Sequence, residues 1–297
     1  ATPETTTSQE KEEPVQVTTG RFEEKMAQEA ASCGGMFVDV AYPFVRFLIF
    51  TLDEGIKVEQ DQMKSPFIFR GTSKNLSIGT GAAAHDVFLK VWKTEDVDHR
   101  LVELECLYHQ RAFQAGVPVA APILSKIAKS TSLCGTEYLV MATENIRQDR
   151  IGTKGDLVKF FRSLIQTVEL LHTEAQLLHG DLKLENLRWY DGMVRLVDFG
   201  RAQPIHEAKN VRGTEGFEAP EILDGMPCST KTDAFAVGCI ILECVDHPDP
   251  WDEISGEALY RQYGVLKHLG EWLAHSNPES RWSLQKASEY LATIPNL

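Results

Sequence analysis

Carboxylate and amide side chains at a fixed spacing form the chemically most informative part of the chain. The stretch from His179 to Gly200 reads HGDLKLENLRWYDGMVRLVDFG and places Asp181 and Asp198 17 positions apart. Phosphoryl transfer requires bound phosphates, metal charge at the phosphate oxygens and a carboxylate that orients the attacking hydroxyl. HGDLKLEN offers Asp181 as this base, Lys183 as a cation and Asn186 as an uncharged metal ligand. The pattern therefore predicts phosphoryl-transfer chemistry.

Two further positions complete the predicted site. In the triplet DFG, Asp198 is the stronger candidate ligand for Mg²⁺, which prefers hard oxygen donors. In VFLKVW, Lys90 stands on a predicted strand, from which its ammonium group can reach phosphate oxygens. Because a carboxylate in apolar surroundings is costly unless paired, Asp181 and Asp198 are expected to be ion-paired or bound to metal.

The composition limits the classes of partner. The 297 residues are 43% hydrophobic and 25% charged, which is ordinary for a globular protein with a sizeable core. Thirty basic residues against 43 acidic ones give a formal charge of −13, so nucleic acid is not expected to be a main partner. The longest apolar run, Phe44 to Leu52, is too short to span a bilayer and contains Arg46, so no transmembrane segment is predicted.

The cysteines show neither CxxC spacing nor a nearby histidine cluster, so a zinc site is not expected. Several of them stand in apolar runs such as VGCIILECV and are predicted to be small buried residues. Their pairing is left open. The six positions are Cys33, Cys106, Cys134, Cys228, Cys239 and Cys244.

The first half of the chain is predicted to be rich in strands. Residues 1–20 are polar and are expected to be a disordered lead-in. Arg21 to Ser32 suits a helix. Strand patterns follow between Phe67 and Trp92, then a helix over Asp98 to Gln114 and a buried strand over Glu137 to Asn145.

Beyond Asp156 the pattern becomes mainly helical. LVKFFRSLIQTVELLH places apolar residues on one helix face, and DAFAVGCIILECV is apolar nearly all round, as a fully buried helix would be. A strand-rich front and a helical back therefore predict two lobes joined near Glu144 to Asp156.

Six features follow one another along the chain in a fixed order: FLKVW, an acidic helix, HGDLKLEN, DFG, GTEGFEAPE and DAFAVG. Together they resemble the eukaryotic protein kinase family over roughly Phe67 to Leu291, about three quarters of the chain. The resemblance implies an α+β, two-lobed fold with a small antiparallel-sheet N-lobe over 66–145 and a mainly helical C-lobe over 146–297. It leaves 21–65 as an N-terminal extension packed on or near the N-lobe.

The resemblance also assigns catalytic roles. Asp181 is the implied catalytic base, and Lys183 is the cation typical of Ser/Thr kinases. Lys90 is implied to contact the nucleotide phosphates and to pair with a glutamate of the following helix. Glu103 is predicted to be this partner because apolar Cys106 and Leu107 follow it at helical spacing, although Glu105 has the more usual distance from Lys90 and remains an alternative.

The remaining implied site residues bind the nucleotide or support the base. Met141 would lie at the back of the adenine pocket, with Ala142 to Glu144 as the hinge, and Asn186 and Asp198 would hold Mg²⁺. Three structural positions are also implied: Thr214 supporting Asp181, Glu221 pairing with Arg281, and Asp233 bracing the catalytic loop.

The chain departs from the family at the phosphate-binding loop. Kinases carry GxGxxG about twenty residues before the strand lysine. Here Gly79 and Gly81 stand too close to Lys90, with Gly79 only 11 positions away, and the expected place reads SPFIFRGTSK with Gly71 alone. No Gly-rich loop is therefore expected over the phosphates.

A second departure concerns regulation. Gly180 stands where kinases regulated by activation-loop phosphorylation carry arginine, and RAQPIHEAKNVRG from Arg201 to Gly213 contains no Ser, Thr or Tyr. Switching by phosphorylation of that stretch is therefore not expected.

A missing glycine loop beside retained catalytic residues is similar to the with-no-Gly-loop kinases that apicomplexan parasites secrete into their vacuole. That group contains active Ser/Thr kinases and the bradyzoite pseudokinase. The resemblance implies a secreted Ser/Thr kinase of the parasitophorous vacuole that uses ATP and Mg²⁺ on protein substrates. The alternative is a pseudokinase that serves as a binding scaffold in the vacuole or cyst wall. The enzyme is favoured because every residue that performs chemistry is present, and GTEGFEAPE argues against a small-molecule kinase.

Overall fold

The computed structural model describes most of the chain from residue 48 onward. The described ranges are 48–51, 54–60, 66–73, 85–122, 126–131, 137–151, 154–246 and 257–293. The predicted lead-in 1–20, the predicted helix Arg21 to Ser32 and the two glycines Gly79 and Gly81 lie outside these ranges. The expected limits of the N-terminal extension therefore stay predictions.

A six-stranded sheet forms the first part of the described chain. Its strands lie in the order β1-β2-β3-β4-β6-β5, and every neighbouring pair is antiparallel. Leu89 and Val91 of the central strand β4 project from the same face of the sheet, and both are buried. The strand bounds are β1 (Leu48–Thr51), β2 (Glu54–Gln60), β3 (Phe67–Ser73), β4 (His85–Lys93), β5 (Ala128–Thr131) and β6 (Glu137–Glu144).

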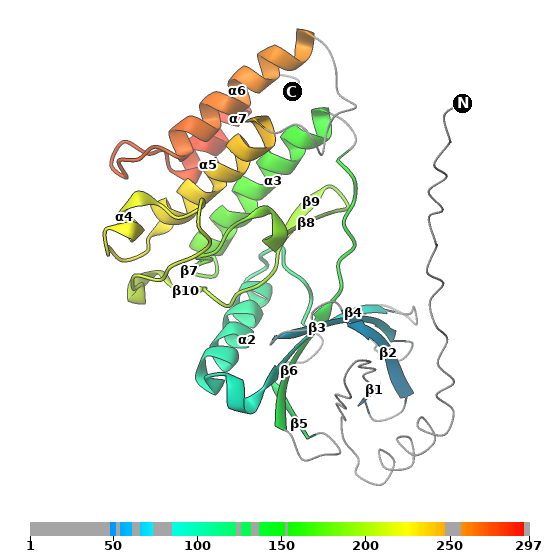
Figure 1. The fold of residues 1–297 in the computed structure, drawn as a ribbon. Coiled ribbons are helices and arrows are strands. Elements are labelled where there is room, and N and C mark those ends of the chain that lie inside the picture. The colour runs from blue at the N-terminus through cyan, green and yellow to red at the C-terminus, as the bar shows by residue number, and fades with distance from the viewer. Residues whose placement is uncertain are drawn as a thin grey trace, which may run out of the picture.

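Helix α2 (His99–Gln114) packs against this sheet, as Figure 1 shows. It begins where the Asp98 carboxylate accepts a hydrogen bond from the Arg100 amide, and it ends before Gly116, whose φ is 78°. The predicted helix is confirmed. The buried side chains that join helix and sheet are Trp92, Val102, Cys106, Leu139 and Met141.

The second part of the chain is mainly helical and encloses its own core. Helix α3 (Lys154–Thr173) contains the stretch LVKFFRSLIQTVELLH, and the residues of its apolar face are buried: Leu157, Phe161, Leu164, Val168 and Leu171. The larger helices are α3 (Lys154–Thr173), α5 (Thr230–Asp246), α6 (Glu257–Leu273) and α7 (Leu284–Ala292). The smaller elements are η1 (Thr94–Asp96), η2 (Leu184–Asn186), η3 (Ile205–Glu207), α4 (Pro220–Leu223), β7 (Leu177–Leu178), β8 (Leu187–Tyr190), β9 (Met193–Leu196) and β10 (Gln203–Pro204).

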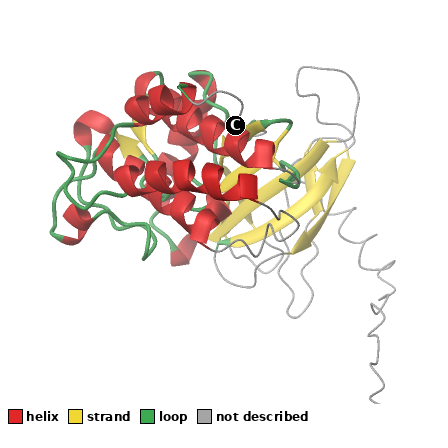
Figure 2. Cartoon of the chain, turned by 90° about the horizontal axis from the view of Figure 1, so that it is seen from above, coloured by secondary structure: helices red, strands yellow, loops and turns green. Residues whose placement is uncertain are grey.

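Helix α5 runs through the centre of this helical part. A Cβ atom added to Gly238 would lie 2.5 Å from the Ala274 amide nitrogen, so only glycine lets α5 approach the end of α6 this closely. Seen from above in Figure 2, the helices gather on one side and the large sheet on the other. The α+β, two-lobed architecture predicted from the sequence is confirmed.

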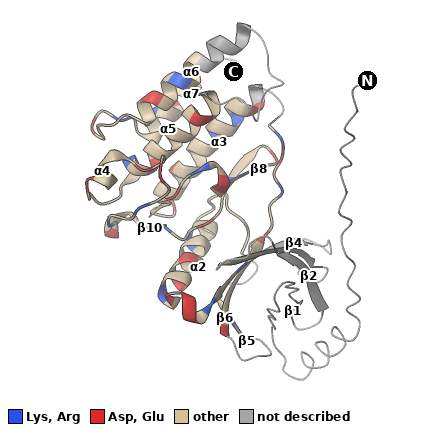
Figure 3. Ribbon diagram, in the orientation of Figure 1, with Lys and Arg blue, Asp and Glu red and all other residues tan. Residues whose placement is uncertain are grey.

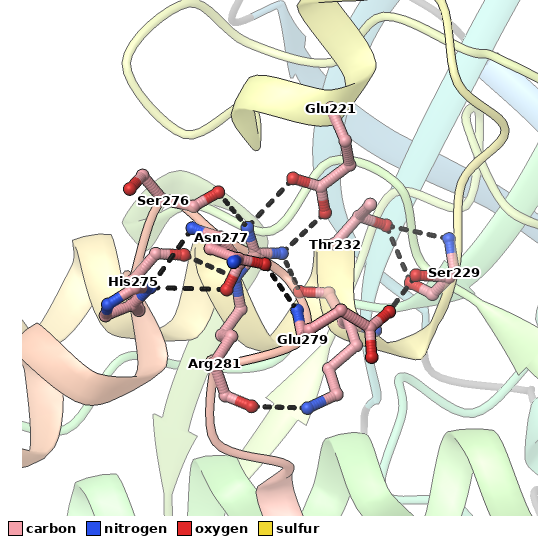
Figure 4. A network of polar contacts seen from close by, with 9 residues as sticks. Glu221, Ser229, Thr232, His275, Ser276, Asn277, Glu279 and Arg281 are labelled. Carbon is pink, nitrogen blue, oxygen red and sulfur yellow. Dashed lines mark hydrogen bonds and ion pairs between the residues drawn. The ribbon is translucent and has the colours of Figure 1, made fainter.

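A buried ion pair closes the helical part, and Figure 4 shows its surroundings. The Arg281 guanidinium, with a fully buried side chain, donates to both Glu221 carboxylate oxygens at 2.6 and 2.8 Å. It also donates to the carbonyl oxygens of Lys231 and His275, each at 2.8 Å. The predicted pairing of Glu221 with Arg281 is therefore confirmed, and it ties α4 to the segment before α7.

The surface bears charges of both signs. In Figure 3, Lys and Arg are interspersed with Asp and Glu along the visible helices. None of the helices in the described ranges combines the length and apolar character that crossing a membrane would need.

Candidate active site

The loop that carries Asp181 is anchored by a carboxylate beneath it. Asp233, fully buried in the first turn of α5, accepts hydrogen bonds from the amides of His179 at 2.8 Å and Gly180 at 3.0 Å. Its Oδ2 also lies 2.8 Å from Nε2 of His172. Burial alone would raise the pKa of Asp233, but these hydrogen bonds outweigh burial and hold the pKa below its usual range. The predicted brace is confirmed.

The Asp181 carboxylate is oriented by a relay of three side chains. Lys183 Nζ donates to the Thr214 hydroxyl at 2.8 Å, and that hydroxyl donates to Oδ1 of Asp181 at 2.7 Å. Lys183 Nζ lies 3.5 Å from the other carboxylate oxygen. The Asn186 amide nitrogen donates to the Asp181 carbonyl oxygen at 2.8 Å. The predicted contact between Thr214 and Asp181 is therefore present, and all four residues share one cluster.

Lys90 bridges the two lobes. Its Nζ lies 2.7 Å from Oε1 of Glu105 on α2 and 2.9 Å from Oδ1 of Asp198. Burial alone would lower the pKa of Lys90, but the two carboxylates outweigh burial and raise it. Burial likewise opposes ionisation of Asp198, yet Lys90 keeps the pKa of Asp198 below its usual range. Both groups are therefore charged at neutral pH.

The prediction that Glu103 pairs with Lys90 is wrong. Glu103 is exposed on the outer face of α2, whereas Glu105 is buried facing the sheet. The prediction took Cys106 and Leu107 together as a buried face, but Leu107 is 55% exposed. Since successive helical residues turn by about 100°, the buried face follows the line of Glu105 rather than that of Glu103. The Lys90 partner is therefore Glu105, the alternative that the sequence left open.

A cavity of about 800 Å³ lies between the sheet and the catalytic loop. Cavities of roughly 300–1,000 Å³ are usual for small-molecule and cofactor sites. Met141 and Glu144 line it, as predicted for nucleotide-binding residues. Ala142 is buried in β6 and is not among the described lining residues, because its side chain points away from the cavity-lining face of the strand. The catalytic-side lining includes Lys90, Glu105, Asp181, Asn186 and Asp198.

The donor set fits Mg²⁺. The Asp198 side chain is 43% exposed although Lys90 holds one of its oxygens, so the carboxylate remains accessible. Asn186 lines the same cavity, and because its amide nitrogen donates to Asp181, its Oδ1 is the atom suited to a metal. A carboxylate and an amide oxygen are hard donors of the kind Mg²⁺ prefers.

The segment between Asp198 and Glu221 is held by its own side chains. The buried Gln203 accepts from the Lys209 amide at 2.8 Å and donates to the Lys209 carbonyl oxygen at 3.2 Å. Arg212 donates to both oxygens of Glu218 at 2.6 and 2.8 Å. These contacts order the segment that carries Thr214.

The comparison with known families decides the identity. The protein kinase domain family matches residues 126–291, which is more than half of the chain. The chain belongs to the protein kinase family. Within this kinase domain, Asp181, Lys183, Asn186 and Asp198 lie inside the matched residues, while Lys90 and Glu105 lie before them.

Curated relatives of this chain are protein kinases, and several are named as serine/threonine-protein kinases. Serine/threonine-protein kinase H1 of Mus musculus is 32% identical over 159 residues, which are 47% of this chain and 37% of the relative. Mitogen-activated protein kinase kinase kinase 3 of Arabidopsis thaliana is 29% identical over 143 residues, 44% of this chain and 21% of the relative. Serine/threonine-protein kinase Nek6 of Oryza sativa subsp. japonica is 36% identical over 139 residues, 41% of this chain and 26% of the relative. The chain thus spans well under half the length of these relatives.

The kinase site contains one group of residues that sequence reasoning did not single out. The His109 ring lies 5.2 Å from the Phe199 ring, which lies 5.3 Å from the His179 ring, and both pairs are tilted, so three rings pack against one another behind the site. Burial lowers the pKa of His109, whose Nε2 lies 2.6 Å from the Ala120 carbonyl oxygen. The sequence did contain one indication of this contact: His109 follows Glu105 by four positions, so both side chains lie on the same face of α2.

Proposed function

We propose that this chain is a Ser/Thr protein kinase that transfers the γ-phosphate of ATP to hydroxyl groups of protein substrates. The observation that carries the proposal is the relay from Lys183 through Thr214 to Asp181, facing the Lys90–Asp198 pair across one cavity. The kinase family match and the Ser/Thr kinase relatives support the same reaction class.

The geometry gives each residue a role. The substrate hydroxyl oxygen attacks the γ-phosphorus while the bond to the β-phosphate oxygen breaks, and ADP leaves with that electron pair. Asp181 receives the hydroxyl proton, and Thr214 holds its carboxylate in the accepting orientation. Lys183 and Lys90 offset the negative charge of the phosphates. Mg²⁺, held by Asn186 and Asp198, would supply additional positive charge at the phosphate oxygens.

We further propose that the phosphates are held without a Gly-rich loop. The connection between β2 and β3, residues 61–65, reads DQMKS and contains no glycine. The family match also begins only at Lys126, after the strand that carries Lys90. These points favour the with-no-Gly-loop group of secreted apicomplexan kinases, and with it secretion into the parasitophorous vacuole.

The proposed domain organisation follows the same resemblance. Residues 66–145 would form the kinase N-lobe and 146–297 the C-lobe. Residues 21–65 would form the N-terminal extension, preceded by a disordered lead-in over 1–20. Its described strands are part of the N-lobe sheet itself, because β1 pairs with β2 and β2 pairs with β3. Limited proteolysis with mass spectrometry of the fragments would test these boundaries.

A pseudokinase scaffold is the second candidate. The 2.9 Å contact between Lys90 Nζ and Asp198 Oδ1 favours it, because this ion pair occupies the groups that phosphate and metal would use. In an enzyme the pair must open when Mg-ATP binds. In a scaffold it would persist, and the lobes would serve only to present surfaces to partner proteins.

Melting temperature and phosphate transfer separate these candidates. For an enzyme, millimolar Mg-ATP should raise the melting temperature of the wild-type chain, because ligand binds only the folded state, and Asp198→Ala should abolish the shift. Transfer of labelled phosphate to Ser/Thr proteins should then disappear in Asp181→Ala while the ATP-dependent shift persists. A shift without any transfer identifies a nucleotide-binding pseudokinase, and no shift identifies a scaffold.

A further inference from the structure

Arg201 is an exposed cation at the phosphate end of the cavity. It directly follows DFG, and it lines the same cavity as Lys90, Asp181 and Asp198. We propose that its guanidinium binds the terminal phosphate of the nucleotide, the group that is transferred, and so replaces backbone contacts of a Gly-rich loop. This inference rests on the proposed function.

The main chain of Arg201 is fixed directly beside the catalytic loop. A Cβ atom added to Gly180 would lie 2.6 Å from the Arg201 carbonyl oxygen and 3.5 Å from the Arg201 Cβ. The Ala202 amide donates to the Phe199 carbonyl oxygen at 3.0 Å, which holds the turn. The Arg201 side chain therefore starts next to the residue that precedes Asp181, on a backbone that cannot shift without moving that loop.

The Arg201 guanidinium is also uncommitted. Across the described ranges, its side chain takes part in no hydrogen bond or ion pair. Lys90, by contrast, is engaged by Glu105 and Asp198, and Lys183 is engaged by Thr214 and Asp181. Arg188, another cation that lines the cavity, donates to the carbonyl oxygens of Glu185 and Leu187. Arg201 is thus the lining cation best placed to accept a new anion.

The charge balance of the site calls for such a cation. Five carboxylate side chains line the cavity, against only two cations, Lys90 and Arg188, besides Arg201 itself; the five are Glu105, Glu144, Asp181, Glu185 and Asp198. Before any metal binds, a triphosphate would therefore meet a surface with an excess of negative charge. A guanidinium corrects this excess and matches the geometry of phosphate with two parallel N–H donors.

The position of Arg201 indicates which phosphate it binds. Its Cβ lies next to Gly180, on the side of the cavity where Asp181 would receive the hydroxyl proton, whereas Lys90 approaches from the sheet. The phosphate nearest Asp181 during transfer is the terminal one. A phosphorylated residue of the same segment is not a competing ligand, because residues 201–213 contain no Ser, Thr or Tyr.

Affinities for ATP and ADP test the proposal without requiring turnover. Calorimetric titration of the full chain with Mg-ATP and Mg-ADP would compare wild type with Arg201→Gln and Arg201→Lys. The matched control Arg150→Gln removes the same charge at an exposed position that is not among the described lining residues. The nucleotide-free melting temperature of each variant checks that it folds.

Loss of a charge-assisted contact should weaken ATP binding by Arg201→Gln about tenfold or more while ADP binding changes less than about twofold. Arg201→Lys should retain part of the ATP affinity, and Arg150→Gln should match wild type. Equal losses for ATP and ADP, or unchanged ATP binding with a raised KM for the protein substrate, would overturn the assignment to the terminal phosphate. If wild type binds neither nucleotide, the proposed function fails, and this inference fails with it.

Discussion

The Thr214 hydroxyl donates a 2.7 Å hydrogen bond to the Asp181 carboxylate and at the same time accepts one from Lys183. One hydroxyl therefore links the candidate base to its neighbouring cation. Thr214 and Asp181 lie on different segments, 33 positions apart. The hydrogen bond therefore couples the conformation of the segment between Asp198 and Glu221 to the orientation of the base.

This relationship predicts the effect of removing the hydroxyl. Thr214→Val keeps the shape of the side chain but leaves Asp181 and Lys183 without their bridge. We expect kcat to fall about 10- to 100-fold, a large part of the contribution of an oriented general base, with little change in ATP affinity. Steady-state kinetics with saturating ATP would measure it.

Thr214→Ser is the matched control for this prediction. It restores the hydroxyl without the methyl group and should retain most of the activity. Equal activity of Thr214→Val and wild type would show that the hydroxyl does not orient the base.

The two glutamates of α2 provide a paired test of the Lys90 contact. Glu105→Gln removes the buried partner at 2.7 Å, and we expect the free energy of unfolding to fall by about 1–3 kcal/mol because Lys90 keeps only Asp198. Glu103→Gln, two residues away and exposed, should change it by less than about 0.5 kcal/mol. Urea unfolding of both variants would measure the difference, and similar values for the two would contradict the observed pairing.

The glutamates also show how far sequence reasoning reaches. The spacing of HGDLKLEN and DFG sufficed to bring Asp181, Asn186 and Asp198 to one cavity, because short motifs fix local geometry. The choice between Glu103 and Glu105 failed because it depended on which residues face the sheet, and Leu107 proved to be exposed. Apolar character alone does not determine burial.

Contacts between distant segments were harder to predict. The α2 boundaries were readable because Asp98 and Gly116 act on their own helix ends. By contrast, the close approach of Arg201 to Gly180 joins positions 21 apart, and no local pattern encodes it. The sequence showed only that Gly180 stands where regulated kinases carry arginine. The structure shows that the Arg201 backbone occupies the space a side chain at position 180 would need.

The Asp233 brace predicts a pH dependence of stability. A carboxyl group with a folded pKa below its unfolded value of 3.8 stabilises the fold above pH 3.8 and loses this contribution as the pH falls through the folded pKa. Asp233→Asn replaces the charged acceptor of the His179 and Gly180 amide hydrogen bonds by a neutral amide. We expect this change to lower the free energy of unfolding by about 3–5 kcal/mol at neutral pH. The gap between variant and wild type should narrow below pH 3.8.

Urea unfolding at a series of pH values would record this convergence. The exposed Asp224 offers the control Asp224→Asn, which should follow the wild-type curve throughout. If the difference in unfolding free energy between Asp233→Asn and wild type stayed constant to the lowest pH measured, ionisation of Asp233 would not stabilise the catalytic loop.

Alanine variants of Gly180 and Gly192 distinguish the cost of backbone strain from the cost of a steric clash. Both have positive φ, 75° and 70°, but an added Cβ atom would meet the Arg201 carbonyl oxygen at 2.6 Å in the first case and nothing within 4 Å in the second. Gly192→Ala should therefore lower the free energy of unfolding by only about 1–2 kcal/mol, the cost of a left-handed alanine. Gly180→Ala should lower it by at least about 1 kcal/mol more, since the loop or Arg201 must move.

ATP affinity gives the second readout for this pair. Displacement of Arg201 by Gly180→Ala should weaken binding of ATP more than binding of ADP, whereas Gly192→Ala should affect neither, because Gly192 lies in the β8–β9 turn and is not among the described residues that line the cavity. If the two alanine variants unfold alike and bind ATP alike, the catalytic loop and Arg201 are not packed as closely as the 2.6 Å approach requires.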